Sequence, residues 1–188
     1  MISSILRLPI RMLPVVALAV LAACAPMAGP VGNLAVPQPA KNVEPARYLG
    51  RWYELGRYEA PFQRDCEAVT ADYSLREDGK IGVLNSCHKG TVNGPLKTAK
   101  GTAKIADTTT NAKLKVSFFG PIYGDYWILD RAEDYGWAIV GEPSGRYLWM
   151  LSRTANPDAT MRKTIENRVR EMGYDWSLVR PTQQAESR

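Results

Sequence analysis

Hydrophobic and polar residues alternate with a period of two through most of the chain between Tyr48 and Arg153. Such alternation is typical of strands that bury one face, and clusters of turn residues divide it into short runs. The pattern predicts eight strands, over residues 50–59, 67–76, 80–88, 96–105, 112–119, 124–130, 136–141 and 146–153.

The connections between these runs are short. Asp78-Gly79 is typical of a hairpin turn, and Asn93-Gly94-Pro95, Gly120-Pro121 and Glu142-Pro143-Ser144-Gly145 separate later runs. Short connections favour antiparallel pairing of consecutive strands, and eight such strands can close into a barrel that leaves no exposed edge. We therefore expect an all-β fold, an eight-stranded antiparallel up-and-down barrel.

One segment after the last strand has the period of a helix. Its apolar residues recur at steps of four, four and three: Met161, Ile165, Val169 and Met172. Asn156-Pro157-Asp158 predicts an N-cap followed by proline at the first helical position, and Gly173 predicts the end of the helix. We expect this single α-helix to lie on the barrel wall with a solvated basic face; binding of a partner by that face is the alternative. Residues 176–179 are expected to add to the sheet edge.

The first 23 residues differ from the rest of the chain. Two arginines precede an apolar run at residues 13–20 that is too short to span a bilayer, as in an export signal. Leu21-Ala22-Ala23-Cys24 resembles a bacterial lipobox, which implies cleavage before Cys24 and acylation of that cysteine. Ala25 is not the aspartate that retains lipoproteins at the inner membrane, so we expect a lipid anchor in the outer membrane and a periplasm-facing domain. A soluble secreted protein with a cysteine beside its cleavage site is the alternative.

Residues 24–44 are predicted to be a lipidated cysteine and a flexible tether. This segment carries almost no charge and is rich in residues that break periodic structure: Pro26, Gly29, Pro30, Gly32, Pro37 and Pro39. We expect the barrel and its helix over residues 45–181 and a tail over residues 182–188.

Composition narrows the function. Loss of the signal peptide removes two of the 24 basic residues and leaves 22 against 19 acidic ones. This near balance, without a basic tract interleaved with aromatic residues, argues against nucleic acid as a partner. One histidine and three cysteines argue against a zinc site or an imidazole-based triad, and His88 is expected to face solvent rather than to bind haem. We expect no catalytic residues, no cofactor and no metal.

Strand alternation also predicts which side chains face the interior. The expected inward residues of the second to fifth strands are Val69, Ala71, Tyr73, Leu75, Ile81, Val83, Asn85, Ala99, Gly101, Ala103, Ile105, Leu114, Val116 and Phe118. The small Gly101 and Ala103 are expected to leave space in an apolar cavity, which suits a fatty acyl chain or a similar lipid. A core filled by side chains is the alternative.

Cys66 and Cys87 remain in the exported domain once Cys24 carries lipid. Pairing is the economical inference in an oxidising compartment, and two free thiols or a redox pair are the alternative. The hairpin at Asp78-Gly79 places residue 87 opposite residue 69 or 70, so a disulfide with Cys66 requires a bulge or a bend in the strand.

Trp52 begins one predicted strand and Arg153 ends another. In a closed barrel both lie at the same end, where the guanidinium can stack on the indole and donate hydrogen bonds to loop carbonyls. We expect a structural role for this pair rather than ligand contact. Glu54 shares a face with Trp52 and is expected to belong to a buried structural network.

Four blocks of the chain resemble motifs of the lipocalin family. Residues 48–55, which contain Gly50 and Trp52, are similar to the Gly-x-Trp signature of the first lipocalin strand, and residues 151–153 are similar to the last block. Residues 118–127 and 147–150 resemble bacterial outer-membrane lipocalins and their plant and apolipoprotein D-like relatives. Residues 130–135 depart from the form common in secreted members, so the contacts of that loop are not carried over.

The resemblance implies a small lipid ligand, a fatty acid or a lysophospholipid, carried or stored at the outer membrane. Tyr126, Tyr147 and Trp149 are candidates for the mouth and wall of the site, because their rings can pack on an acyl chain while their polar tips hold a head group. Two other functions stay open: an envelope lipoprotein with a filled barrel that binds another protein, and an enzyme acting on carotenoid or haem. The sequence also leaves open whether two copies associate.

Overall fold

The computed structural model describes residues 29–185, and all eight predicted strands are present within two residues of their predicted bounds. The strands are β1 (Gly50–Tyr58), β2 (Cys66–Leu75), β3 (Ile81–Lys89), β4 (Leu96–Ile105), β5 (Lys113–Phe119), β6 (Ile122–Arg131), β7 (Trp137–Gly141) and β8 (Leu148–Ser152).

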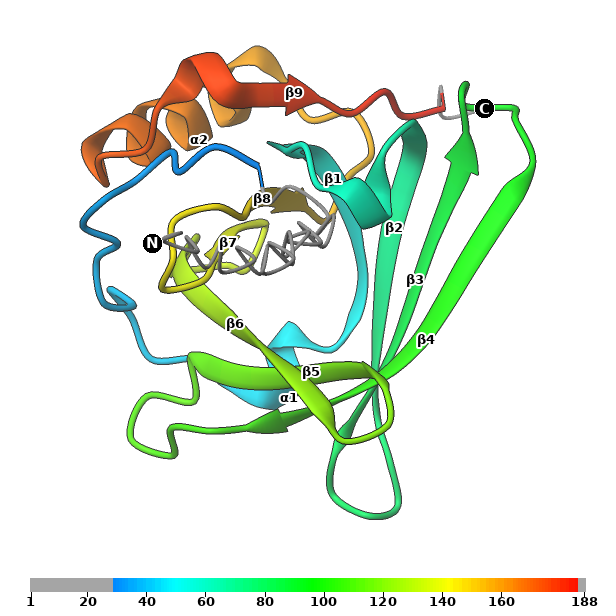
Figure 1. Cartoon of the computed structure of the whole chain (residues 1–188). Helices are drawn as coiled ribbons and strands as arrows, with labels where there is room; N and C mark the ends of the chain where they lie inside the picture. The colour runs from blue at the N-terminus through cyan, green and yellow to red at the C-terminus, as the bar shows by residue number, and fades with distance from the viewer. Residues whose placement is uncertain (1–28, 186–188) are drawn as a thin grey trace, which may run out of the picture.

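These strands form a closed antiparallel barrel (Figure 1). Each strand pairs with the next along the chain, and β1 pairs with both β2 and β8, so the sheet closes on itself. The predicted fold class is therefore confirmed. In the part of the chain that the structure describes, no helix is long and apolar enough to cross a membrane.

The first strand changes its neighbour halfway along. β1 pairs with β2 from Gly50 to Tyr53, and from Gly56 to Tyr58 it pairs with a ninth short strand, β9 (Val179–Pro181). A register shift between Glu54 and Gly56 marks the change. β9 thus covers a length of β1 edge that β2 leaves free, which removes an edge that could pair with another chain.

The predicted edge strand at residues 176–179 is wrong in its position. Trp176–Leu178 forms a 3-10 helix, η2, because the Asp175 side chain accepts hydrogen bonds from the backbone N–H and the hydroxyl of Ser177 and closes a turn there. The strand begins only at Val179.

The single helix α2 (Ala159–Glu171) has the predicted apolar face but a different start. Its N-cap is Asp158, whose carboxylate accepts from the Met161 N–H at 2.8 Å, so Pro157 precedes the cap and does not occupy the first helical position. The helix ends before Gly173, which has the positive φ of +83° that favours glycine.

The helix packs on the outside of the barrel. Its buried residues Ile165 and Val169 join an apolar cluster with Leu129, Ile139 and Met150 of the barrel wall. Its basic side chains are largely paired, because Arg168 contacts Asp130 and Arg170 contacts Glu166. Because these charges are neutralised within the protein, the arrangement supports the expected solvated face rather than a basic surface that binds a partner.

Residues 29–44 do not form the free tether that the sequence predicts. Backbone hydrogen bonds join Gly32 to Gly145, Ala40 to Leu129 and Val43 to Thr110. The segment therefore runs along the barrel as the blue loop of Figure 1 shows, and it leads into a short helix, α1 (Pro45–Tyr48). The reason is that a proline-rich chain lacks periodic structure but can still donate its backbone N–H groups to barrel carbonyls. The predicted signal peptide, Cys24 and the first residues of the predicted tether lie outside the described residues.

The predicted boundary of the tail is also wrong. Thr182 is buried, Gln183 accepts from the Ala68 N–H, and the Gln184 side chain donates to the carbonyls of Glu54 and Val69. The domain therefore continues at least to Gln184, because polar side chains after β9 satisfy barrel backbone groups that the strands leave unpaired.

The barrel has two different ends. The closed end holds α1, the start of β1 and the loop between β2 and β3, and the open end holds the 3-10 helix η1 (Pro61–Gln63) and the loops between β3 and β4, β5 and β6, and β7 and β8. These names for the two ends are used below.

Candidate ligand site in the barrel

Arg153 and Trp52 meet at the closed end. The guanidinium carbon of Arg153 lies 3.8 Å from the centroid of the Trp52 ring, and Trp52 is fully buried. The guanidinium donates to the carbonyls of Arg51, Arg47 and Leu49 at 2.7 to 2.9 Å, which ties α1 to the start of β1. Burial lowers the pKa of Arg153, which stays charged at neutral pH. The contacts are those of a structural clamp at the barrel floor.

Gly50 permits the chain to enter β1 from α1. Its φ is +89°, a left-handed conformation that glycine adopts without strain. The Trp52 indole N–H then donates to the Tyr48 carbonyl at 2.8 Å, which closes the turn. These contacts give a physical reason for glycine and tryptophan two residues apart.

The closed half of the interior is filled by side chains. Ala103 and Val140 are fully buried, and Leu114, Val83 and Ile128 are nearly so. A cavity of about 10 Å³, whose lining includes Tyr48 and Tyr73, is at the lower limit for one water molecule. This half therefore has no room for an acyl chain.

The space expected at the fourth strand is occupied by the protein itself. A Cβ atom added to Gly101 would lie 2.8 Å from the ring of Phe118, so glycine is required here because that ring packs against the β4 backbone. Ala103 is enclosed by the core cluster. Both positions face inward as predicted, but neither leaves a gap, and the expectation of space at this strand is wrong.

The half of the interior nearer the open end is different. Inward-facing side chains there pack against the core cluster yet stay only half-buried: Ala71, Val116, Phe118, Tyr126 and Trp149. They come from β2, β5, β6 and β8, so they line the lumen from several sides. A half-buried apolar lining inside a barrel is the arrangement that small lipophilic ligands require.

Three tyrosine hydroxyls meet at the base of this lining. The Tyr126 hydroxyl lies 2.8 Å from that of Tyr48 and 2.9 Å from that of Tyr73. Burial raises the pKa of all three phenols, that of Tyr73 to about 12, so all are neutral donors near pH 7. Of the three aromatic residues expected at the mouth and wall, Tyr126 therefore lies in the wall, near the base of the lining.

Tyr147 and Trp149 are at the mouth. Their rings stack at 5.8 Å and 7°, and the exposed Phe62 of η1 lies 5.8 Å from Tyr147. The Trp149 indole N–H donates to the Gln63 side chain at 3.0 Å, which holds η1 against β8. This aromatic group covers one side of the open end.

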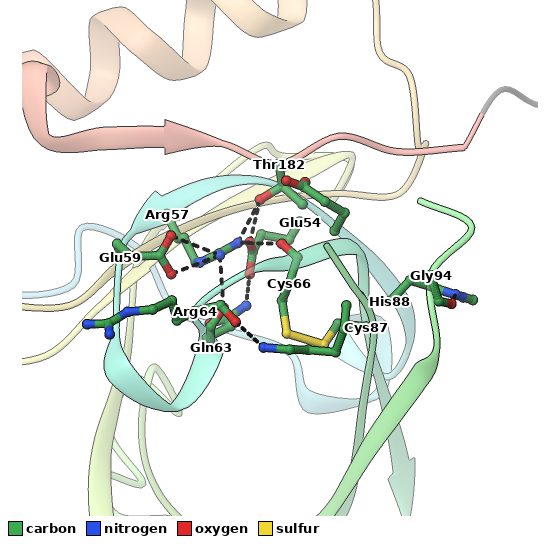
Figure 2. Close-up of a disulfide and its surroundings, with 12 residues drawn as sticks. Glu54, Arg57, Glu59, Gln63, Arg64, Cys66, Cys87, His88, Gly94 and Thr182 are labelled. Atoms are coloured by element: carbon green, nitrogen blue, oxygen red, sulfur yellow. Dashed lines mark hydrogen bonds and ion pairs between the residues drawn. A yellow bond between two sulfur atoms is a disulfide. The ribbon is translucent and has the colours of Figure 1, made fainter. Parts of the chain in front are cut away.

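A charged network whose cation the sequence did not reveal is buried beside the mouth (Figure 2). Glu54 accepts from Arg57 at 2.8 Å, from Thr182 at 2.5 Å and from Gln63 at 2.5 Å, and both ionic side chains are almost completely buried. Arg57 also pairs with Glu59. Burial lowers the pKa of Arg57, but the charge of Glu54 and the hydrogen bonds to Glu54 and Glu59 outweigh it, so the pKa lies above its ordinary value. The structural network expected for Glu54 exists, with Arg57 as its cation.

Sequence reasoning had no signal for Arg57. Strand alternation counted from Trp52 puts residue 57 on the outer face, and only the bulge between Glu54 and Gly56 turns Arg57 inward. A bulge has no fixed sequence signature.

The disulfide between Cys66 and Cys87 is confirmed, with Cα atoms 5.4 Å apart. The register of β2 and β3 shifts between Glu67 and Thr70, which is the bulge that the pairing required. Figure 2 shows the bond beside the Glu54–Arg57 network at the open end. Val69 packs on the two sulfur-bearing residues, so it belongs to the rim of the lumen.

Removal of this disulfide by Cys66→Ser with Cys87→Ser should lower the free energy of unfolding by about 3 kcal/mol, because the bond closes a loop of 21 residues in the unfolded chain. Urea denaturation of the two proteins measures the difference. Equal midpoints would contradict the prediction, and reduction of the wild-type protein should reproduce the loss.

The structure also gives the positions of three other residues that the sequence analysis singled out. Leu75 is 69% exposed, and its prediction as a lining residue is wrong because β2 pairs with β1 only up to Tyr73, so no opposite wall faces residue 75. Asn85 lies on the inward face of β3, and its side-chain oxygen is buried with no hydrogen-bond partner among the described residues. His88 follows Cys87 on the opposite face, where its ring bonds to the Gly94 carbonyl at 2.7 Å.

The closed barrel, the floor clamp and the half-buried lining define a small antiparallel β-barrel with an apolar interior, and comparison with known proteins shows its family. Residues 43–184 match the model of a lipocalin-like domain, and the chain belongs to the lipocalin family.

Its relatives include bacterial and plant proteins. The chain is 40% identical over 172 residues to the outer membrane lipoprotein Blc of Escherichia coli K12, covering 89% of this chain and 94% of that protein. It is 39% identical over 155 residues to temperature-induced lipocalin-1 of Arabidopsis thaliana, covering 78% and 81%. Insecticyanin from the tobacco hornworm Manduca sexta has a similar fold, with a TM-score of 0.65, 19% identity and coverage of 82% and 88%.

Proposed function

We propose that this lipocalin binds a fatty acid or a lysophospholipid in the open half of its barrel and carries or stores it at the bacterial outer membrane. The observation that carries the proposal is the half-buried apolar lining, Ala71, Val116, Phe118, Tyr126 and Trp149, above a fully packed floor. The similarity to outer membrane lipoproteins supports the location.

The tyrosine cluster gives the ligand a polar anchor. Tyr48, Tyr73 and Tyr126 have three O–H donors, but the contacts among them use only two. The third donor needs another acceptor, and a ligand carboxylate at the base of the lining can supply it. A hydrogen bond to a charged group is stronger than one between neutral groups, so this contact favours an anionic lipid.

Blocking the lining should abolish binding. Ala71→Trp puts a large ring into the lumen next to the half-buried residues, so it should prevent saturable uptake of a fluorescent fatty acid. The matched control is Ser74→Trp, three residues along the same strand at an exposed position. Thermal melting checks that both variants fold. Normal uptake by a folded Ala71→Trp protein would contradict the lumen site, and no saturable uptake by the wild type would favour the filled-barrel alternative.

Removing the central hydroxyl should discriminate between head groups. Tyr126→Phe keeps the ring but breaks both hydroxyl contacts, so affinity for a fatty acid should fall about tenfold, as for one lost hydrogen bond to a charged group. Affinity for the corresponding methyl ester should change much less. Titration of each ligand against the protein's tryptophan fluorescence measures both constants, and equal losses would exclude the tyrosines as the carboxylate anchor.

We further propose that acylated Cys24 anchors the protein. Several acyl chains on one residue give stable attachment, whereas a single chain gives only marginal binding. Cys24→Ser should therefore move the protein from the membrane fraction to a soluble or unprocessed form on cell fractionation. Correctly processed Cys24→Ser protein that stays in the outer membrane would exclude the anchor.

A further inference from the structure

One polar side chain of β3 lies among the apolar residues of the barrel interior. Asn85 follows the same strand alternation as the core residues Ile81 and Val83, so it is on the inward face. Its side-chain oxygen, Oδ1, is buried and accepts no hydrogen bond from a described residue. Unpaired buried oxygens are rare in proteins, because burial removes their bonds to water without replacing them. The oxygen is therefore an acceptor for which the described part of the fold supplies no donor.

The residues opposite Asn85 explain why it is unpaired. Across the strand pairs, Asn85 faces Ala71 on β2 and Ala99 on β4. Neither alanine carries an atom beyond Cβ, so neither covers the amide or bonds to it. Ala71 is half-buried and Ala99 is exposed, so this part of the wall belongs to the open half of the barrel. The amide is thus flanked by small apolar side chains within the candidate ligand site.

Two polar side chains one inward position away from Asn85 do not serve it either. Tyr73, on the side of the closed end, has its hydroxyl 2.9 Å from that of Tyr126 and not beside the amide. Lys97, on the side of the open end, is exposed and makes no bond to Oδ1. The donor that completes Asn85 is therefore expected from a bound molecule.

Asn85 has a defined depth in the lumen. Along β3 it is two residues beyond Val83, which is the partner of Tyr73, and two residues before Cys87 of the disulfide. Two residues of a strand span about 7 Å. A lipid whose carboxylate binds the tyrosine hydroxyls therefore passes Asn85 with the part of its chain that lies a few carbons from the carboxylate.

A hydroxyl group is the ligand group that fits this amide. The terminal torsion of asparagine is soft, so the amide can turn its oxygen or its nitrogen toward the lumen. A hydroxyl both donates and accepts a hydrogen bond, so it pairs with either atom. Because it is uncharged, it enters an apolar lumen at a lower cost than an ammonium group. An ionised carboxylate has acceptors only, and an unsubstituted acyl chain leaves Oδ1 unpaired.

We propose that Asn85 makes the site selective for acyl lipids that carry a hydroxyl group close to their polar end. This inference rests on the proposed function, because it assigns a preferred ligand to the same lumen. Two kinds of lipid have such a group: fatty acids hydroxylated near the carboxylate, and monoacyl glycerolipids, whose glycerol keeps a free hydroxyl. In both, the hydroxyl donates to Oδ1 while the rest of the chain packs on the apolar lining.

The test compares pairs of lipids that differ by one hydroxyl. Wild type, Asn85→Leu and the matched control Asn167→Leu, an exposed asparagine of α2, are titrated with tetradecanoic acid and 3-hydroxytetradecanoic acid by displacement of a fluorescent fatty acid. A second pair, a lysophosphatidylcholine and its analogue without the glycerol hydroxyl, distinguishes the glycerol source from the chain source.

We expect wild type and control to bind the hydroxylated member of at least one pair about fivefold more tightly, as for one hydrogen bond between neutral groups. Asn85→Leu should bind both members of that pair equally. Its thermal midpoint should equal or exceed that of wild type, because the substitution removes an unpaired buried oxygen.

Three outcomes would overturn the proposal. The first is equal binding of both members of both pairs by wild type, which leaves lipid binding itself intact. The second is a preference that persists in Asn85→Leu, which places the hydroxyl elsewhere. The third is a lower midpoint with weaker binding of all four lipids by Asn85→Leu, which indicates a structural role. Absence of saturable binding of every lipid by wild type would instead reject the proposed function, and the selectivity with it.

Discussion

Replacement of Arg57 by methionine is expected to lower the free energy of unfolding by about 3 to 5 kcal/mol, because it leaves the Glu54 carboxylate buried without its cation. The remaining partners of Glu54, Thr182 and Gln63, are neutral donors and cannot balance the charge. Loss of Arg57 also removes donors to the Cys66 and Gln63 carbonyls. The free energy of unfolding from urea titrations of wild type and variant measures the effect.

A second substitution distinguishes an uncompensated charge from lost packing. Arg57→Met combined with Glu54→Gln removes both charges, so the double variant should be more stable than Arg57→Met alone. As a control, Arg51→Ala breaks the exposed pair with Asp72 and should cost less than about 1 kcal/mol. A single Arg57→Met variant as stable as the Arg51→Ala control would show that the network contributes nothing.

Replacement of Arg153 by alanine is expected to lower the free energy of unfolding by about 2 to 4 kcal/mol, because a half-buried side chain loses its contact with the buried Trp52 ring and several hydrogen bonds at once. It removes the cation from the face of Trp52 and three donors from the carbonyls of Arg47, Leu49 and Arg51. The floor of the barrel would then lose the link between α1 and β1. Denaturant titration followed by tryptophan fluorescence reports both stability and the environment of Trp52.

The conservative variant Arg153→Lys separates charge from geometry. Lysine keeps the cation but lacks the planar fork that serves three carbonyls at once, so its stability should lie between those of wild type and Arg153→Ala. Arg153→Ala should leave fatty acid uptake nearly unchanged at temperatures where it is folded, because the clamp lies at the opposite end from the lining. A folded Arg153→Ala protein that melts like wild type would contradict the structural role.

The fold could be predicted from the sequence because its determinants are local. Strand alternation depends on neighbouring residues, and turn pairs such as Asp78-Gly79 set the hairpins, so the bounds of eight strands were recovered within two residues. The disulfide could be inferred with its bulge because the hairpin register follows from the turn. The start of the helix was missed by two residues, because Asn156 and Asp158 are both favourable N-cap residues.

The candidate site could be predicted only in part. Strand alternation correctly predicted that Ala71, Val116 and Phe118 face inward. It did not predict how much space lies between these side chains. Gly101 indicated a gap from its size, whereas the Phe118 ring of the neighbouring strand fills that gap. Whether a small residue leaves a cavity depends on the side chain opposite, which alternation along one strand does not contain.

The all-β class, the antiparallel order, the amphipathic helix, the disulfide and the pairing of Trp52 with Arg153 at one end of the barrel could all be inferred from the amino-acid sequence. Only the tertiary structure revealed the cation of the buried Glu54–Arg57 network, the tyrosine hydroxyl cluster, the course of residues 29–44 along the wall and the short pairing of β4 with β5, which covers only Thr102 to Ile105 of β4. The physical reason is the sequence separation between the residues that interact. Hydrophobic period and turn chemistry act between residues close in the chain, whereas these four features depend on a bulge, on strand lengths and on contacts between segments as far apart as Glu54 and Thr182.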